Sequence, residues 1–130
     1  MKSAILLVDH GSRRPEANRV VEALAAAVQG RAPDRVVRVA HLELVEPDIG
    51  AGIDACVAAG ADRIDVHPYF LGPGNHTSRD IPRLVGEAAQ RHPGVRVRIS
   101  APLGFHEKLA DLVLERIAQL DEAPERRPPG

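Results

Sequence analysis

Residues 3–8 read SAILLV, a continuous apolar run that is followed at once by Asp9, His10 and Gly11. A half-exposed strand would alternate apolar and polar residues, whereas a run of this length without alternation is typical of a strand buried on both faces. The glycine directly after it marks the end of the strand. This stretch therefore favours a sheet with both faces covered.

The rest of the chain alternates between helical and extended patterns. Apolar residues recur at three-and-four spacing in the amphipathic segments, and mixed or alternating apolar runs lie between them. Helices are predicted over residues 14–29, 49–59, 80–91 and 105–120, and further strands over residues 35–44, 63–68 and 95–100. Four strands that alternate with four helices indicate an α/β fold, an open, doubly wound, mainly parallel four-stranded sheet with helices on both faces.

Turn-forming residues separate the third strand from the third helix. Residues 71–77 read LGPGNHT, and their Gly, Pro and Asn residues predict a loop. Thr77 or Ser78 would then cap the following helix, and Pro82 would fall in its first turn, where a proline is tolerated.

Length and charge narrow the class of protein. The chain has 130 residues, which suits one domain over residues 1–121 with a disordered, Pro-rich tail over residues 122–130. The formal net charge of −1 argues against a nucleic-acid partner, and no apolar run approaches the roughly 18 residues of a membrane span. Cys56, the single cysteine, has no internal disulfide partner and is expected to be a small buried residue. The first residues do not resemble a signal peptide, so a cytoplasmic location is expected.

Three chemically capable side chains follow three different predicted strands. His10 follows the first strand, Glu43 ends the second, and His76 lies in the loop after the third. The carboxyl ends of parallel strands meet at one edge of a sheet, where ligands bind in such folds. Two imidazoles and a carboxylate suit a divalent first-row metal ion, which predicts an exchangeable metal site, unless each group only hydrogen-bonds to backbone.

The surroundings of His10 leave several interpretations open. The turn His10-Gly11-Ser12 resembles a small anion-binding turn, but Asp9 stands where a histidine phosphatase would have arginine. Asp9 would either orient the His10 ring or be an ordinary strand-end acid. Positive charge also gathers near this edge and would bind a polyacidic small molecule, unless these arginines only begin solvated helices. The residues concerned are Arg13, Arg14 and Arg79.

The remaining histidines are expected to be structural. His41 and His67 lie on predicted strands, and a functional role is the alternative interpretation for each. His92 and His106 lie at predicted helix ends, where an imidazole can interact with the helix dipole.

Three blocks of sequence together resemble one family. LVDHGSR near the start, HLELVEPDI in the middle and PYFLGPGNHTSRDIP after the third strand are similar to the small sirohydrochlorin chelatases, the class II chelatases of the cobaltochelatase and ferrochelatase type. The resemblance covers roughly residues 3–120, and the third block is the most specific. Asp9 and His67 depart from the small residues that are more usual at these positions.

The resemblance implies a function and its participants. A chelatase of this type inserts Co²⁺, Fe²⁺ or Ni²⁺ into sirohydrochlorin, a carboxylate-rich tetrapyrrole of cobalamin, sirohaem or nickel-cofactor synthesis, with no organic cofactor and no ATP. By similarity, His10 and His76 match metal-binding and catalytic histidines, and Glu43 matches the acidic metal ligand. Substrate contacts are expected from Ser12, Arg13, Arg14, Gly74 and Arg79.

The resemblance also bears on assembly. Short members of the family pair as homodimers, whereas longer members join two such domains in tandem. A homodimer would also supply the second wall that a flat tetrapyrrole needs, and would add to a core with only 2% aromatic residues. A metal or tetrapyrrole carrier without turnover is the alternative function.

Overall fold

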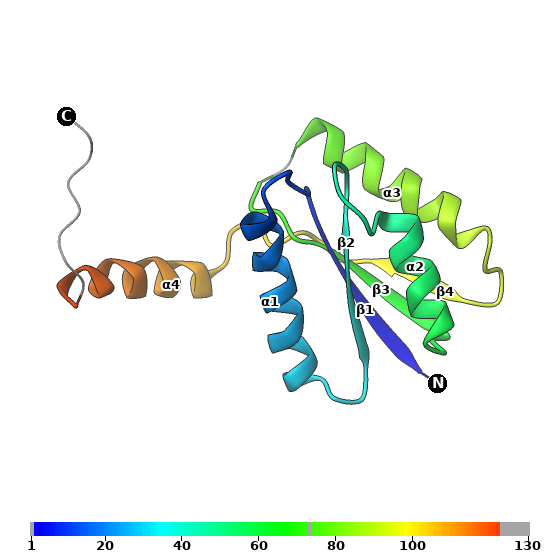
Figure 1. Ribbon diagram of the computed structural model, residues 1–130, viewed down its shortest axis with the longest axis horizontal. Helices are drawn as coiled ribbons and strands as arrows, with labels where there is room; N and C mark the ends of the chain where they lie inside the picture. Colours follow the sequence, from blue (N-terminus) through cyan, green and yellow to red (C-terminus); the bar gives the residue numbers. More distant parts are fainter. Residues whose placement is uncertain (1, 73, 123–130) are drawn as a thin grey trace.

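The computed structural model describes residues 2–72 and 74–122, apart from the side chains of residues 75–78. Within this part, four strands alternate with four α-helices, as the sequence predicts (Figure 1). The strands are β1 (Ser3–Asp9), β2 (Val36–His41), β3 (Arg63–Pro68) and β4 (Arg96–Ile99). The helices are α1 (Pro15–Arg31), α2 (Ile49–Ala58), α3 (Asn75–Ala89) and α4 (Glu107–Ala118), followed by a 3-10 turn, η1 (Gln119–Asp121). The predicted tail over residues 122–130 lies outside the described residues after Glu122.

All four strands are parallel, and their order across the sheet is β2-β1-β3-β4. The apolar strand β1 therefore lies inside the sheet, where Leu6 pairs with Arg38 of β2 and with Val66 of β3. Leu6 and Val8 are 0% exposed and Leu7 is 4% exposed. The prediction that both faces of this strand are buried is confirmed.

Helices cover the two faces of the sheet unequally. On one face, α1 packs Val21 and Ala25 against Leu7 and Val37. On the other face, α2 and α3 close a larger core. Its buried members include Leu6, Ile49, Ile53, Ile64, Val66, Ile81 and Val85. The predicted doubly wound α/β fold is therefore confirmed, with a core built from aliphatic side chains.

The cysteine belongs to the larger core. Cys56 is 0% exposed on α2, and burial raises the pKa of its thiol to about 11. A thiol with so high a pKa is protonated near neutral pH and is a poor nucleophile. Cys56 is thus the small buried residue that the sequence predicts.

Helix α4 does not join either core. Figure 1 shows it projecting away from the sheet and the other helices. Its amphipathic pattern is the predicted one, but none of its residues is buried. The exposed apolar side chains of α4 and η1 are Leu112, Val113, Leu114, Ile117 and Leu120, between 42% and 67% exposed. Among the described residues, no helix has the length and apolar character that a membrane crossing requires.

Two predicted boundaries are wrong. β2 ends at His41 rather than at residue 44, because the chain bends there and Leu44 adopts a φ of 73°. Helix α3 begins at Asn75, with Gly74 as its N-cap residue, so Pro82 lies inside the helix and neither Thr77 nor Ser78 is the cap. A proline removes one backbone donor from a helix. Here the helix continues because Ile81 and later apolar residues of α3 are buried against the sheet.

Charged and polar side chains line the strand pair β3–β4. Arg98 binds the carboxylate of Asp65 through Nε and Nη2 at 2.7 and 2.9 Å, which lowers the pKa of Asp65. His67 lies half-buried on β3, the strand that also carries Asp65, and its Nδ1 is 2.8 Å from the Ser100 hydroxyl. Burial lowers the pKa of His67 below its usual value of 6.5, because the charged imidazolium is poorly solvated there.

The lowered pKa of His67 predicts a pH-dependent stability. Below about pH 6.5 the unfolded chain binds a proton that the folded chain resists, so the free energy of unfolding should fall as pH drops from about 7.5 to 5. His67→Asn removes the titrating group and should make this fall smaller. Urea unfolding at several pH values tests this, and equal pH slopes for the variant and the parent chain would contradict it. The pKa values of Asp54 and Asp65 are also lowered in the folded chain. The stability that these two carboxylates contribute is therefore lost only at more acidic pH, from about 4 downward.

Candidate metal-binding rim

The loops after β1 and β2 are tied together beyond the ends of the strands. Leu42 donates its backbone N–H to Asp9 O at 2.8 Å, and Glu43 donates to His10 O at 3.1 Å. These bonds continue the parallel ladder past the last paired residues of the two strands. His10 and Glu43 are thus brought side by side at the carboxyl edge of the sheet, as predicted.

The side chains of His10 and Glu43 face each other and remain open to solvent. The His10 Nδ1 atom lies 3.9 Å from Glu43 Oε1, and the two side chains are 59% and 62% exposed. The His10 ring also packs edge to face against Phe70, with 5.3 Å between ring centroids. Such a contact orients the imidazole without using either of its nitrogens. This nitrogen and this carboxylate oxygen belong to two of the three predicted ligands of a divalent ion.

Gly11 is required for this approach of the two loops. Its φ is +89°, in the region that favours glycine, and a Cβ built on it would lie 2.0 Å from the backbone oxygen of Glu43. The same Cβ would be 3.1 Å from the Cβ of His41. The Glu43 loop therefore packs directly on a position where only a hydrogen fits.

A pocket of about 390 Å³ opens beside His10, between the ends of β1 and β3 and the first turns of α1. Phe70, Tyr69 and Val20 give it an apolar wall, while Asp9 and His10 contribute polar groups. This combination of an apolar wall and a few polar groups is typical of small-molecule sites.

The turn from His10 to Ser12 is held by internal hydrogen bonds. Ser12 donates its backbone N–H to Asn18 Oδ1 at 2.9 Å, and Asn18 Nδ2 donates back to Ser12 O at 2.7 Å. The Ser12 hydroxyl accepts from Arg14 N at 3.1 Å. These bonds occupy the backbone N–H groups of Ser12 and Arg14, two of the donors that an anion bound at this turn would use.

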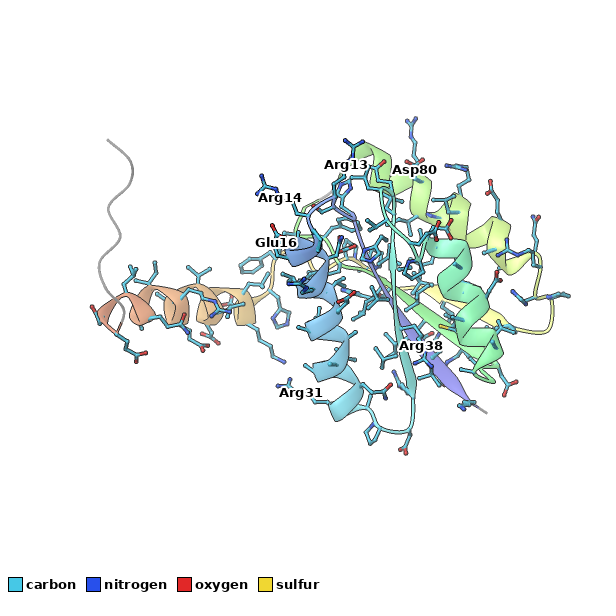
Figure 2. All side chains as sticks on the ribbon, viewed as in Figure 1. Arg13, Arg14, Glu16, Arg31, Arg38 and Asp80 are labelled. Atoms are coloured by element: carbon cyan, nitrogen blue, oxygen red, sulfur yellow. The ribbon has the colours of Figure 1, made fainter. Side chains whose placement is uncertain are left out.

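The arginines of the rim are exposed. Arg13 and Arg14 precede α1, and Figure 2 shows both side chains at the end of the molecule where this helix begins. Arg79 is exposed on α3. Positive side chains therefore lie on the loop after β1 and on the helix after β3.

His76 lies in the first turn of α3 rather than in a loop, directly after Gly74 and Asn75. Its side chain is outside the described residues, so the predicted meeting of His76 with His10 and Glu43 stays a prediction. Within the described part of the chain, no three His, Cys, Asp or Glu side chains form a group able to hold a metal ion.

One polar contact at the rim was not predicted from the sequence. His41 is buried at 2% exposure, and its Nδ1 lies 2.6 Å from Asp9 Oδ1. Asp9 is therefore the partner of His41, while the carboxylate nearest to the His10 ring is Glu43 at 3.9 Å. No sequence pattern signalled this contact, because the strand was predicted to run on to residue 44 and the pairing of Asp9 with His41 follows from the register of β1 with β2.

The other histidines have structural partners. His92 Nε2 lies 2.7 Å from Asp54 Oδ1 on the surface. His106 is the N-cap residue of α4, where its Nδ1 accepts from Lys108 N at 3.1 Å. Both contacts agree with the prediction that these residues are structural.

The parallel sheet and the histidine–carboxylate pair at its carboxyl edge define an α/β protein with a candidate metal-binding rim. Comparison with known proteins agrees with this class. The family model CbiX matches residues 4–120, and the chain belongs to this family.

Relatives and solved structures support the same assignment. The chain is 43% identical over 113 residues to the chloroplastic sirohydrochlorin ferrochelatase of Arabidopsis thaliana, covering 87% of this chain and 50% of that protein. It is 33% identical over 138 residues to the sirohydrochlorin cobaltochelatase of Methanococcus maripaludis, covering 87% of this chain and 96% of that protein.

A crystal structure of the sirohydrochlorin chelatase SirB from Bacillus subtilis subspecies spizizenii in complex with cobalt is similar, with a TM-score of 0.84 and 36% identity over 92% of this chain and 51% of that one. The chain thus spans about half the length of several relatives and nearly the full length of others.

Proposed function

We propose that this protein is a sirohydrochlorin chelatase that inserts a divalent metal ion into a carboxylate-rich tetrapyrrole without ATP or an organic cofactor. The observation that carries the proposal is the exposed pair of His10 and Glu43, 3.9 Å apart, on the rim of a chain of the CbiX family. The similar ferrochelatase and cobaltochelatase, and the cobalt complex of a similar chelatase, support Co²⁺ and Fe²⁺ as substrates. Ni²⁺ suits the same ligands.

Metal insertion requires protein ligands that bind the ion and then release it to the tetrapyrrole. His10 and Glu43 are the proposed first ligands, and His76 is proposed as the third. A site with few protein ligands and open coordination positions can exchange them for pyrrole nitrogens, which a closed cage would prevent. The ring must also lose two N–H protons, and either His10 or His76 is proposed to accept them in turn, after its own bond to the ion is released, and to pass each to solvent, since a neutral imidazole accepts protons near neutral pH.

The rim also offers contacts for the macrocycle and its carboxylates. Phe70 and Val20 line the pocket beside His10 and supply an apolar surface for the flat ring. Arg13, Arg14 and Arg79 are exposed and are proposed to bind the substrate carboxylates. Ser12 and Gly74 complete the proposed substrate-binding set.

The absorption spectrum of sirohydrochlorin tests the proposed activity. The tetrapyrrole changes its visible spectrum when it takes up a metal, so purified protein mixed with sirohydrochlorin and Co²⁺ or Fe²⁺ should shift the spectrum faster than a protein-free mixture. A rate equal to the protein-free control would refute the chelatase proposal.

Helix α4 supports a homodimer. Its apolar side chains are exposed in the single chain, and burial of each would contribute about 1.5–3 kcal/mol to an interface. The linker that leads into α4 is fastened to the rim, since Gly104 N donates to Phe70 O at 3.3 Å. The partner copy of a dimer held through α4 is proposed as the opposite wall of a tetrapyrrole cleft.

Two substitutions on α4 should disrupt such a dimer. Val113 and Ile117 lie one helical turn apart and are 60% and 58% exposed. Val113→Glu with Ile117→Glu should raise the dissociation constant of the dimer about 100-fold or more, whereas Lys108→Glu on the other side of the helix should not. Sedimentation velocity gives the result. A parent chain that is active and strictly monomeric at assay concentration would contradict the homodimer.

A cytoplasmic location is part of the proposal. The single cysteine, Cys56, is a buried free thiol, so the fold uses no disulfide within the chain and does not depend on an oxidising compartment.

A further inference from the structure

The pair formed by Asp9 and His41 lies directly beneath the candidate ligands. Asp9 is the last residue of β1, His41 is the last residue of β2, and the two are paired in register across the sheet. Their side chains meet at 2.6 Å between Oδ1 and Nδ1. Asp9 is also part of the pocket that contains His10. The pair therefore sits between the hydrophobic core and the rim.

The burial of this pair needs a reason beyond stability. His41 is 2% exposed and is the one buried polar or charged residue in the part of the chain that the structure describes. The Asp9 side chain is 18% exposed. A largely buried ionisable pair gains little over apolar side chains of the same size, because desolvation offsets most of the attraction between the two groups. A directional hydrogen bond does, however, fix the relative position of the two groups more closely than apolar packing.

Each member of the pair is connected to a candidate ligand by a very short length of backbone. His10 follows Asp9 directly, and Glu43 lies two residues after His41. A Cβ built on Gly11 would be only 3.1 Å from the Cβ of His41, so the loop that carries His10 passes close to the base of the His41 side chain. A shift of either strand end would therefore change the distance between His10 and Glu43.

We propose that Asp9 and His41 are positioning residues of the metal site. Their hydrogen bond fixes the ends of β1 and β2 relative to each other, and thereby holds His10 and Glu43 close enough to bind one metal ion. The proposal rests on the proposed function, because it takes His10 and Glu43 to be metal ligands. It concerns metal affinity and requires no proton transfer by the pair.

Substitutions of His41 separate positioning from simple packing. His41→Leu keeps a side chain of moderate size and removes the bond to Asp9, whereas His41→Asn places an amide N–H close to the former Nδ1 position. Calorimetric titration with Co²⁺ alone should show about 10- to 100-fold weaker binding for His41→Leu and largely restored binding for His41→Asn. In the insertion assay, His41→Leu should raise the KM for Co²⁺ more than it lowers kcat.

The chain offers a matched control and a coupling test. His92 and Asp54 form a second histidine–aspartate pair, 2.7 Å apart and on the surface, and His92→Leu should leave Co²⁺ affinity unchanged. Asp9→Ser should weaken Co²⁺ binding as His41→Leu does, and the double variant should be no weaker than the worse single variant, because both changes break the same bond. Should His41→Leu fail to fold, Asp9→Ser and His41→Asn provide the same comparison.

The outcomes are separable from those of the activity itself. Unchanged Co²⁺ affinity in folded His41→Leu or Asp9→Ser would overturn the positioning role, even if the parent chain is an active chelatase. Weakened binding in these variants would support it even if the parent chain binds Co²⁺ and never inserts it, a result that would refute only the proposed function. A parent chain that does not bind Co²⁺ at all would overturn both.

Discussion

His10→Ala is expected to lower the rate of metal insertion about 100-fold or more. The imidazole lies 3.9 Å from the Glu43 carboxylate and packs against Phe70 at the edge of the pocket. Its removal takes away a proposed metal ligand, and also a proposed proton acceptor. Initial rates of the spectral change with sirohydrochlorin and Co²⁺ measure the effect.

The control for His10→Ala is His92→Ala. His92 is bonded to Asp54 on the surface and has no proposed part in the reaction. His92→Ala should therefore retain the parent rate, while both variants should keep the parent circular dichroism spectrum, because His10 is largely exposed. A parent-like rate for His10→Ala would remove this residue from the catalytic role.

Gly11→Ala is expected to destabilise the fold by about 3 kcal/mol or more and to abolish Co²⁺ binding. The new Cβ would overlap the Glu43 backbone oxygen at 2.0 Å, and the positive φ of +89° adds strain for any other residue. The neighbouring atom is backbone, so it can move away only if the whole Glu43 loop shifts. Urea unfolding and calorimetric titration with Co²⁺ give the two measurements.

Gly86→Ala is the matched substitution in open space. Gly86 lies within α3, and a Cβ on it would meet nothing within 4 Å. Alanine is the better helix former by about 0.5–1 kcal/mol, so this variant should be slightly more stable than the parent chain. If the two glycine variants were equally stable, the close approach of Gly11 and Glu43 would be disproved.

The fold could be predicted where one local signal dominates. The apolar run of β1 indicated burial on both faces, and the limits of β3 were predicted to the residue. The signal failed where tertiary packing overrides local preference. Residues 75–77 resemble a loop in sequence, yet they form the first turn of α3, the helix that buries Ile81. In β2 the apolar alternation runs past His41, although the chain turns there.

For the candidate site, the sequence predicted which strand ends carry the functional residues, but not the side-chain contacts made there. Parallel strands bring His10 and Glu43 to one edge, whatever their separation in sequence. The bond between Asp9 and His41 depends on the register of β1 with β2, which composition and periodicity do not encode. Likewise, the amphipathic pattern of α4 identified a helix but did not specify what covers its apolar face.

The most direct test of catalytic metal insertion is to measure how many molecules of metallated tetrapyrrole are formed per protein chain. With sirohydrochlorin and Co²⁺ both in large excess, a chelatase turns over repeatedly, so the product should exceed the amount of protein many times and keep increasing in proportion to time. His10→Ala should fall to the protein-free rate in the same mixture. If the product instead stops at one equivalent per chain, the protein is a carrier of metal or tetrapyrrole, and the chelatase account is contradicted.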